Sequence, residues 1–448
     1  MKKIAQLLAT GVLVYPVLLF AQNPGQEEPL AEDGVVADSA RPIQFSFKNR
    51  PSLRIGDYAQ IDLKTKWHLD FRGFDPPRVN PPGVVTALPV TPDTFLLTRA
   101  RMGLKGSVTK YVEFEVEREM RRTFSDNYEH HPWKDNYVNV KVIPFVHIKA
   151  GKFKIPFGLE ENLSEDRLDF ALDSRVSNTL APSRDVGVML HSKILEGARL
   201  EYQAGVFRND GEASEIHGVP TGRRTYAGRL TSQPFRVINH LPKTIRHVYL
   251  GVAATRGELI PGLNGVNGQT FSNFTYFDHF YVRGNRSRLG TEFAWAEGPF
   301  GIKAEYIKMS EQRKKQGIRG EDLPDKISRG WYVSGSWTVL GKTTSSGKPK
   351  DPLLTGHGFG SVEIGARLDV LSFYGAPGGK GLPSRSPRAS TILPNGERTW
   401  TFGPTWYLNH FMKIQVHAQR EQVTDIARKA VVNQTKFWTG VIRLQLAM

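Results

Sequence analysis

The chain has 448 residues and a formal net charge of +16, from 60 lysines and arginines against 44 aspartates and glutamates. It contains no cysteine, which excludes disulfides, thiol redox chemistry, cysteine metal sites and cysteine nucleophiles. Hydrophobic residues make up only 39%, whereas aromatic residues (10%) and glycine (43 residues) are plentiful, which favours a β-sheet protein with two differently solvated faces over several helical domains.

Residues 1–21 have the pattern of a secretory signal peptide. Lys2 and Lys3 precede an apolar run that continues to Ala21, where we expect cleavage. A transmembrane anchor is the alternative, but the run is short for a bilayer span and is interrupted by glycine and proline. The mature protein is therefore expected to be exported.

The next segment, 22–57, is expected to be a disordered acidic leader that runs into the folded part. Residues 22–40 combine prolines, glycines and acids without any aromatic side chain, and such a composition cannot bury a core. The remaining residues, 58–448, are predicted to form one domain.

Period-two alternation begins after this leader. Between residues 62 and 72, Leu63, Trp67 and Leu69 alternate with charged or polar side chains over the length that a strand needs to cross a membrane. In 95–108 we assign Leu96 to the apolar face and Arg99 to the opposite one. The pattern predicts 16 strands in all: 62–72, 95–108, 111–121, 135–143, 145–155, 184–194, 198–208, 224–233, 244–255, 287–297, 299–309, 329–340, 358–372, 397–408, 410–420 and 434–447. The aromatic-rich run 271–281 is left in a loop.

The connections between these strands alternate in length, as they do in outer-membrane barrels, where short periplasmic turns alternate with long outer loops. The short ones lie around 109, 144, 195–197, 298 and 409. The long ones are 73–94, 123–134, 156–183, 209–223, 256–286, 310–328, 373–396 and 421–433. Two turns, 234–243 and 341–357, are longer than expected. We predict an all-β protein: a transmembrane antiparallel β-barrel of about 16 strands, with both chain ends on the periplasmic side.

The last strand supports this fold, because its apolar face continues to Met448 at the carboxyl terminus, as closing a barrel in lipid requires. Six tryptophans fall in or at predicted strands, where aromatic girdles need them: Trp295, Trp331, Trp337, Trp400, Trp406 and Trp438. A soluble sandwich with tryptophans in its core is the alternative. It does not explain the alternation of loop lengths.

We find no sequence motif for catalysis. There is no G-x-S-x-G, no H-E-x-x-H and no P-loop; His130 and His131 are adjacent in a loop, and the glycine run 356–360 precedes a strand instead of a helix. We therefore expect no enzymatic activity, no metal or other cofactor, and no nucleic-acid partner.

The inward faces of the predicted strands carry more basic than acidic residues. The 15 inward bases are Lys64, Lys66, Arg72, Arg99, Arg101, Lys105, Arg121, Lys149, Arg199, Arg229, Arg288, Lys303, Arg367, Lys413 and Arg443. The 11 inward acids are Asp62, Asp70, Glu113, Glu115, Glu117, Glu119, Glu201, Glu292, Glu305, Glu363 and Asp369. A surplus of lysine and arginine in a narrow aqueous pore favours anions. The alternative for any single residue is an ion pair along the barrel wall.

The third long connection, 156–183, is expected to fold into the barrel. Its bases are interleaved with acids, which can hold the loop against a basic wall. Our hypothesis is that Arg167, Arg175 and Arg184 include cations that remain free for the permeant ion.

Seven stretches, in order along the chain, resemble the phosphate-selective porin O and P family: 98–106 (TRARMGLKG), 151–160 (GKFKIPFGLE), 182–190 (PSRDVGVML), 288–306 (RLGTEFAWAEGPFGIKAEY), 330–341 (GWYVSGSWTVLG), 361–367 (SVEIGAR) and 443–445 (RLQ). The resemblance implies a 16-stranded, commonly trimeric barrel that conducts anions, with its third outer loop folded inward and basic side chains that guide phosphate. Basic residues on matched positions are Arg99, Arg101, Lys105, Lys152, Lys154, Arg184, Arg288, Lys303, Arg367 and Arg443.

From these observations we expect a passive channel for small anions such as phosphate or polyphosphate, forming a homotrimer in the outer membrane of a Gram-negative-type bacterium, with outer-membrane lipid as a further partner. Its pore-lining or anion-binding residues are expected to be Arg99, Arg101, Lys105, Lys149, Lys152, Lys154, Arg167, Arg175, Arg184, Arg288, Lys303, Arg367 and Arg443. The alternative is an adhesin or receptor barrel with little conductance, for which the long outer loops and the basic run 313–315 would provide the binding surface.

Overall fold

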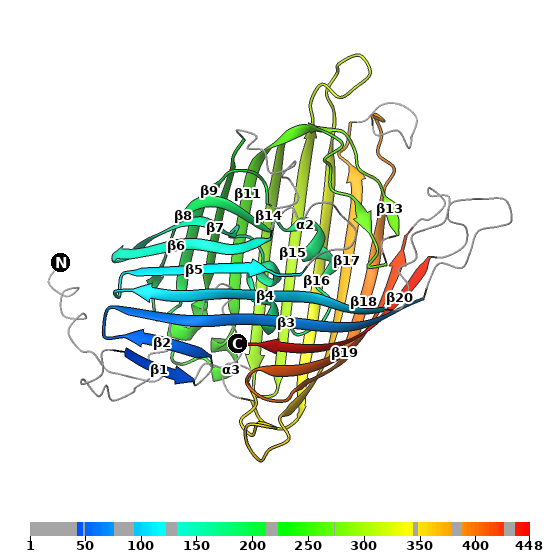
Figure 1. Ribbon diagram of the computed structural model, residues 1–448. Helices are drawn as coiled ribbons and strands as arrows, with labels where there is room; N and C mark the ends of the chain where they lie inside the picture. Colours follow the sequence, from blue (N-terminus) through cyan, green and yellow to red (C-terminus); the bar gives the residue numbers. More distant parts are fainter. Residues whose placement is uncertain are drawn as a thin grey trace.

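A closed antiparallel barrel of sixteen strands dominates the computed structural model (Figure 1). The described residues are 43–47, 50–75, 94–121, 132–211, 223–272, 274–343, 348–378, 388–424 and 435–448. The barrel strands are β3 (Ala59–Asp75), β4 (Thr94–Val108), β5 (Val112–Glu119), β6 (Trp133–Ile143), β7 (Val146–Lys154), β8 (Arg184–Leu195), β9 (Leu200–Phe207), β10 (Thr225–Ser232), β11 (Tyr249–Gly262), β14 (Val282–Glu297), β15 (Phe300–Arg313), β16 (Leu323–Leu340), β17 (Ser361–Gly375), β18 (Asn395–Tyr407), β19 (Met412–Val423) and β20 (Lys436–Ala447). The predicted signal peptide lies outside the described residues.

The barrel closes where its last strand pairs with its first. β20 runs antiparallel to β3, with Ala447 opposite Lys66. The final residue continues this ladder, because Thr65 N donates to Met448 O at 3.0 Å and Met448 N donates to Thr65 O at 2.9 Å. Closure satisfies the backbone polar groups that a sheet edge would expose to lipid. The predicted sixteen-stranded β-barrel is thus confirmed.

Each predicted strand has one counterpart, and the differences have local causes. β11 begins at Tyr249 because Lys243–Arg246 form the short helix α3, which follows Pro242. The segment expected to precede the barrel contains a hairpin, β1 (Ile43–Phe47) with β2 (Pro51–Ile55). β2 pairs with the start of β3, a stretch that β20 does not reach.

One β-bulge changes the expected inward face of β4. His68 pairs with Arg99, but the next residue of β3, Leu69, pairs with Leu97, so Thr98 is the extra residue of the bulge. An extra residue shifts the alternation by one position. Leu96, which we assigned to the outer face, therefore points inward, while Arg99 keeps its predicted side.

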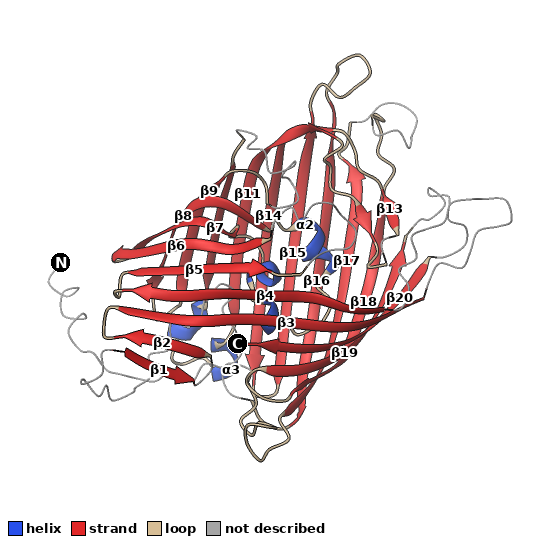
Figure 2. Cartoon of the chain, in the orientation of Figure 1, coloured by secondary structure: helices blue, strands red, loops and turns tan. Residues whose placement is uncertain are grey.

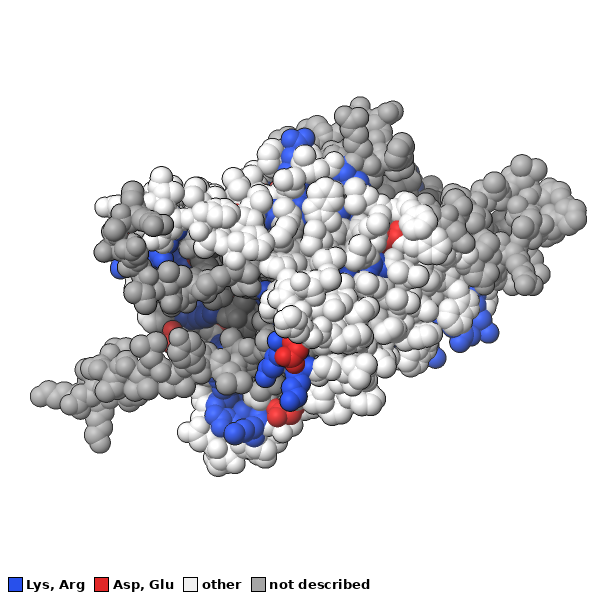
Figure 3. All heavy atoms as spheres, turned by 60° about the horizontal axis from the view of Figure 1, so that its bottom comes forward, with Lys and Arg blue, Asp and Glu red and all other residues white. Residues whose placement is uncertain are grey.

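The outer wall is apolar, and its surface in Figure 3 shows few charged side chains. Trp337 and Trp400 project outward with 50% and 46% of their surface exposed. Near the end that carries the short turns, the indole N–H groups of Trp295 and Trp406 donate to backbone carbonyl groups at 2.8 and 2.9 Å. This arrangement is typical of tryptophans at a membrane interface. We take the end with the short turns as periplasmic.

Within the described residues, helices are few and short (Figure 2): α1 (Leu159–Asn162), the 3-10 turn η1 (Glu165–Arg167), α2 (Arg175–Leu180), the 3-10 turn η3 (Pro234–Val237) and α3. No helix in the described part of the chain has the length and apolar character needed to cross a bilayer.

Two connections on the outer side enter the barrel. Residues 156–183, which we call the crossing loop, carry α1, η1 and α2. Residues 263–281 contain the small sheet of β12 (Gly268–Gln269) and β13 (Thr275–Phe277), and belong to the loop in which we placed the aromatic run. Buried side chains of both connections pack with inward residues of β11, β15, β16, β17, β19 and β20: Phe157, Val176, Leu180, Ala253, Phe274, Tyr276, Phe277, Phe280, Ile307, Met309, Tyr332, Leu371, Phe373, Val423 and Phe437.

Candidate pore and its constriction

The crossing loop leaves β7 and binds first to the opposite wall. Gly158 has φ +83° and passes so close to β15 that a Cβ atom there would lie 2.6 Å from a carboxylate oxygen of Glu305. Glu305 accepts from Leu159 N at 3.0 Å and from the Ser177 hydroxyl at 2.8 Å. One inward carboxylate therefore holds two separate parts of the loop.

The helix α2 is fixed by its first two residues. The Ser174 hydroxyl caps the helix, accepting from the backbone N–H groups two and three residues on, and donates to Asp369 of β17 at 2.5 Å. Arg175 donates to Glu397 of β18 at 3.0 Å and lies 3.3 Å from Glu421 of β19. The helix is thus tied to three adjacent strands.

Basic residues of the far wall bind the middle of the loop. Lys303 of β15 forms an ion pair with Asp169, with N–O distances of 2.8 and 2.9 Å. Arg367 of β17 and Lys413 of β19 donate to backbone carbonyl groups of the loop at 2.8 Å each. These contacts place residues 168–172 against strands far in sequence from the loop's own.

Basic residues of the near wall bind the start of η1. Arg99 and Arg101 of β4 lie 2.5 and 2.8 Å from the same oxygen of Glu165. Burial acts to raise the pKa of Glu165, but the charges of Arg101 and Arg99 prevail and hold it well below its usual range. Glu165 is therefore ionised across the physiological range. The loop spans the barrel between two basic walls.

The hypothesis of free cations is wrong for Arg175 and Arg184. Arg175 is paired as described above, and the guanidinium of Arg184 binds Asp135 of β6 with two hydrogen bonds of 3.1 and 3.0 Å. Both side chains are buried, and a buried guanidinium without a counter-charge is costly. Arg167 lies in η1, lines the cavity described below as the vestibule, and also makes interactions within the structure.

The other predicted residues divide into three groups. Arg288 and Arg443 are wall ion pairs, with Asp210 at 2.5 Å and Asp70 at 2.7 Å. Lys149 lies over the ring of Tyr137 at 4.1 Å, and Lys154 donates to two carbonyl groups of the crossing loop at 2.5 and 2.7 Å. Lys152 was predicted to line the pore, and this prediction is wrong. Lys152 shares the outward face of β7 with exposed Ile148.

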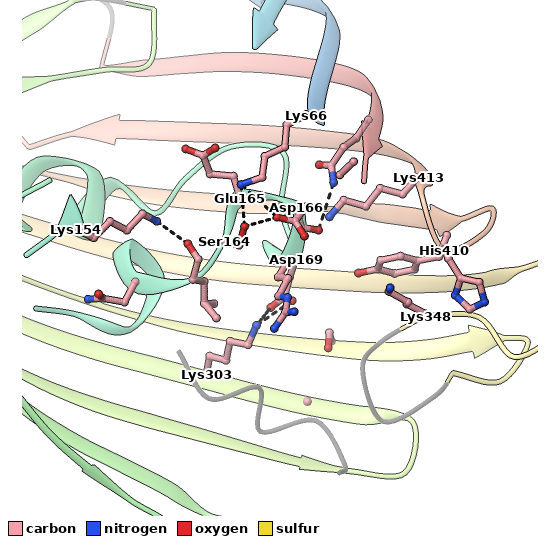
Figure 4. Close-up of a pocket in the computed structure, with 18 of the residues that line it drawn as sticks. Lys66, Lys154, Ser164, Glu165, Asp166, Asp169, Lys303, Lys348, His410 and Lys413 are labelled. Carbon is pink, nitrogen blue, oxygen red and sulfur yellow. Dashed lines mark hydrogen bonds and ion pairs between the residues drawn. The ribbon is translucent and has the colours of Figure 1, made fainter. Parts of the chain in front are cut away.

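A cavity of about 300 Å³, which we call the vestibule, opens at the turn end and reaches the crossing loop (Figure 4). Among the described residues, eleven basic side chains line it: Arg50, Lys64, Lys66, Lys105, Lys149, Lys154, Arg167, Arg184, Lys303, Lys348 and Lys413. Six carboxylates do so: Glu115, Asp135, Glu165, Asp166, Asp169 and Glu363.

A second cavity of about 600 Å³, which we call the outer cavity, lies beside α2 and near the outer ends of β3 and β11. Its lining includes the paired Arg175 and Arg286, the carboxamides of Asn178 and Gln269, and the ring of Phe271. The crossing loop contributes residues to both cavities, so it forms the boundary between them.

Several charged residues that face the lumen were not among the inward residues predicted from the sequence. Glu311, Glu397 and Glu421 are inward and almost wholly buried, and Glu311 pairs with Lys326 and Arg286. Each lies near the outer end of its strand. Extending the inward alternation of 299–309 by two residues would have found Glu311.

A closed barrel with an apolar outer wall, and with a lumen divided by an inward loop, defines an outer-membrane porin. Residues 62–448 match the pattern of the phosphate-selective porin O and P family, and the chain belongs to that family.

Solved structures with a similar fold come from several bacteria. They include in-vitro folded OmpT, an outer membrane protein of Vibrio cholerae (8% identity, TM-score 0.53, covering 87% of this chain and 98% of that one). An anion-selective porin from Comamonas acidovorans is also similar (11% identity, TM-score 0.51, covering 87% and 100%). So is the channel DcaP of Acinetobacter baumannii (9% identity, TM-score 0.50, covering 87% and 98%). At such identities the likeness concerns the fold alone. A comparison with curated proteins found no match.

Proposed function

We propose that this porin is a passive channel for small anions such as phosphate and polyphosphate, and that it works as a homotrimer. The main support for the proposal is the lining of the vestibule, which contains eleven basic side chains and six side-chain carboxylates. A net positive lining lowers the barrier for anions and raises it for cations.

Five of the six vestibule carboxylates form ion pairs with bases, which leaves little negative charge to repel an anion. Glu115 pairs with Lys64, Glu165 with two arginines, and Asp169 with Lys303. Each pair is nearly neutral at a distance. The surplus of bases therefore determines the sign of the field that a permeant ion meets.

Lys105 is the clearest carrier of this surplus. It extends from β4 into the vestibule, is largely buried, and forms no ion pair with a carboxylate within the described part of the chain. Its ammonium group is compact and can bind a phosphate oxygen as a point charge. Membership of a family described as phosphate-selective supports phosphate as the anion.

Ion selectivity in planar bilayers tests the proposal. Under a salt gradient we expect a reversal potential that shows anion preference, and a chloride current that added phosphate reduces. Cation preference without an effect of phosphate would contradict the proposal. The mass of the protein–detergent complex tests the homotrimer separately, and a monomer would contradict that part.

Replacing Lys105→Gln sharpens the test. A unit charge about 8 Å from the ion is worth about 0.5–1 kcal/mol at the dielectric constant of about 40–80 expected in a water-filled lumen, which corresponds to a change of about two- to fivefold in the anion-to-cation permeability ratio. Lys315→Gln in the outer loop between β15 and β16 removes the same charge far from the vestibule and is the control. Equal effects of the two variants would show that Lys105 has no special role.

The adhesin alternative has less support in the structure. Of the basic run 313–315, Arg313 is fully buried and lies over the ring of Phe280. Only Lys314 and Lys315 remain at the surface. Absence of conductance, together with binding to cells or anionic glycans, would favour that alternative.

A further inference from the structure

Three arginines gather at the turn end of the barrel, away from both cavities. Arg199 lies in the turn between β8 and β9, although the sequence pattern placed it on the lumen wall. Arg236 belongs to η3 and Arg246 to α3, both in the long connection between β10 and β11. We call these three residues the rim arginines. None of them contributes to the lining of the vestibule or of the outer cavity.

Backbone contacts hold the two turns together. The Ala198 carbonyl accepts from Gln233 N at 2.7 Å and from the Ser232 hydroxyl at 3.0 Å, which fixes Arg199 beside η3. Arg246 donates to the carbonyl of Arg236 at 3.2 Å. The three guanidinium groups therefore come from chain segments that are fixed relative to one another.

The rim arginines differ in their counter-charges from most arginines of the barrel interior. Within the described residues none of the three forms an ion pair with a carboxylate, whereas arginines of the barrel interior do so: Arg99, Arg101, Arg175, Arg184, Arg229, Arg286, Arg288, Arg367 and Arg443. Burial and the nearby charge of Arg236 lower the pKa of Arg199 to about 10. Positive charges held together in this way are stabilised by an anion.

The surroundings of the rim arginines are those of a membrane interface. Leu250, which pairs with Ser232 across β10 and β11, faces outward and is 41% exposed. Val237 and Ile245, next to Arg236 and Arg246, are also exposed apolar side chains. The arginines thus begin where the apolar wall ends, near α3 in Figure 1. Phospholipid head groups lie at this height.

We propose that the rim arginines bind the phosphate of an anionic phospholipid in the periplasmic leaflet. Guanidinium groups match the geometry of phosphate oxygens, and their weak hydration suits a partly buried site. Exposed Val237 and Ile245 lie where the glycerol and the first acyl carbons of the lipid would pack. Free phosphate shares the same anionic group but would leave this apolar surface uncovered.

Lipid retention by the intact protein tests the proposal. The wild type and a variant with Arg199→Gln, Arg236→Gln and Arg246→Gln are purified in detergent, titrated with phosphatidylglycerol or phosphatidylcholine, and examined by native mass spectrometry. We expect the wild type to retain phosphatidylglycerol in preference to phosphatidylcholine, and the variant to retain phosphatidylglycerol at least tenfold less. Equal retention by both proteins, or equal retention of both lipids by the wild type, would overturn the proposal.

A variant with Lys314→Gln, Lys315→Gln and Arg319→Gln is the control, because it removes three exposed charges at the opposite end of the barrel and should retain the lipid. Unchanged heat-modifiability on gels and unchanged conductance show that the rim variant is folded. If it is not, Arg246→Gln alone provides the same comparison with a smaller loss. Titration with inorganic phosphate separates the two sources: phosphate binding that depends on the rim arginines, without any retention of phosphatidylglycerol that depends on them, would assign the site to the free ion and overturn the lipid proposal.

Discussion

At the scale of single residues, the carboxylates of the crossing loop determine how many vestibule bases act on a permeant ion. Asp169 illustrates this, because its carboxylate is engaged with Lys303 while its backbone carbonyl separately accepts from Thr405 and Gln415 at 3.2 Å each. The side chain can therefore be changed without removing these backbone contacts.

We predict that Asp169→Asn increases anion selectivity. The amide is nearly isosteric and leaves the Lys303 charge uncompensated in the vestibule. At a distance of about 8 Å this corresponds to a rise of about two- to fivefold in the anion-to-cation permeability ratio, measured from reversal potentials in planar bilayers. Glu321→Gln, an exposed change of the same charge in the loop between β15 and β16, should have little effect. An unchanged ratio in Asp169→Asn would mean that the pair does not face the permeant ion.

Ser174 is the residue on which the position of α2 depends most. Its hydroxyl caps the six-residue helix and also binds Asp369. We predict that Ser174→Ala costs about 1 kcal/mol of local stability and lets the loop fluctuate, which single-channel recordings would show as greater open-channel noise. Ser183→Ala is the matched control, because no side-chain hydrogen bond of Ser183 occurs within the described residues. Equal noise in the two variants would contradict this role of the cap.

At the scale of elements, the crossing loop contains two carboxyl groups that titrate near neutrality. Burial raises the pKa of Glu160 and of Glu161 to about 7, although Arg367 acts against it at Glu160 and Lys154 at Glu161. A carboxyl with a raised pKa is favoured in its protonated form by the folded loop. Its contribution to loop stability therefore grows as pH falls from about 7 toward the ordinary value of 4.5. Glu165, whose pKa is depressed, remains charged in this range and keeps the loop on its arginines.

We predict that anion selectivity rises as the pH falls from 8 to 6. Protonation of Glu160 and Glu161 removes up to two negative charges from the loop. Chloride is the ion to measure, because its charge does not change with pH. In the variant with Glu160→Gln and Glu161→Gln the selectivity at pH 8 should be higher than in the wild type, and it should vary less with pH. A pH response like that of the wild type would assign the effect to other groups.

The sequence predicts the elements well where the solvent imposes the pattern. Each barrel strand must turn apolar side chains to lipid and polar ones to the lumen, so alternation marks all sixteen. The bulge at Thr98 shows the limit, because a single extra residue exchanges the two faces and leaves no mark in composition. The helix α3 shows the same limit. It follows Pro242 and occupies the first residues of the strand that was predicted at 244–255.

The contents of the lumen were harder to predict than its wall. Arg175 was expected to be free because its loop is rich in both charges, yet it pairs with Glu397 and Glu421, more than 200 positions away. Such partners follow only from barrel closure and from the exact path of the loop. The basic residues of the near wall were predicted correctly to face inward. The sequence could not show which of them would be neutralised by a paired carboxylate.

At the scale of the whole molecule, two sources of selectivity can be separated: the summed field of the vestibule, and direct contact between particular bases and the anion. Salt screens the first strongly, because the Debye length falls from about 10 Å at 0.1 M to about 3 Å at 1 M. Contact within a narrow, low-dielectric site is screened far less.

We therefore predict that preference for chloride over potassium falls toward unity between 0.1 and 1 M potassium chloride, because the surplus of vestibule bases acts mainly through space. Reduction of the chloride current by phosphate should persist over the same range, because Lys105 and its neighbours must touch the phosphate oxygens to bind them. If both properties disappeared together at high salt, the channel would be a general anion pore without a phosphate site. If both persisted, direct contacts would account for chloride selectivity as well, and the vestibule field would have little part in it.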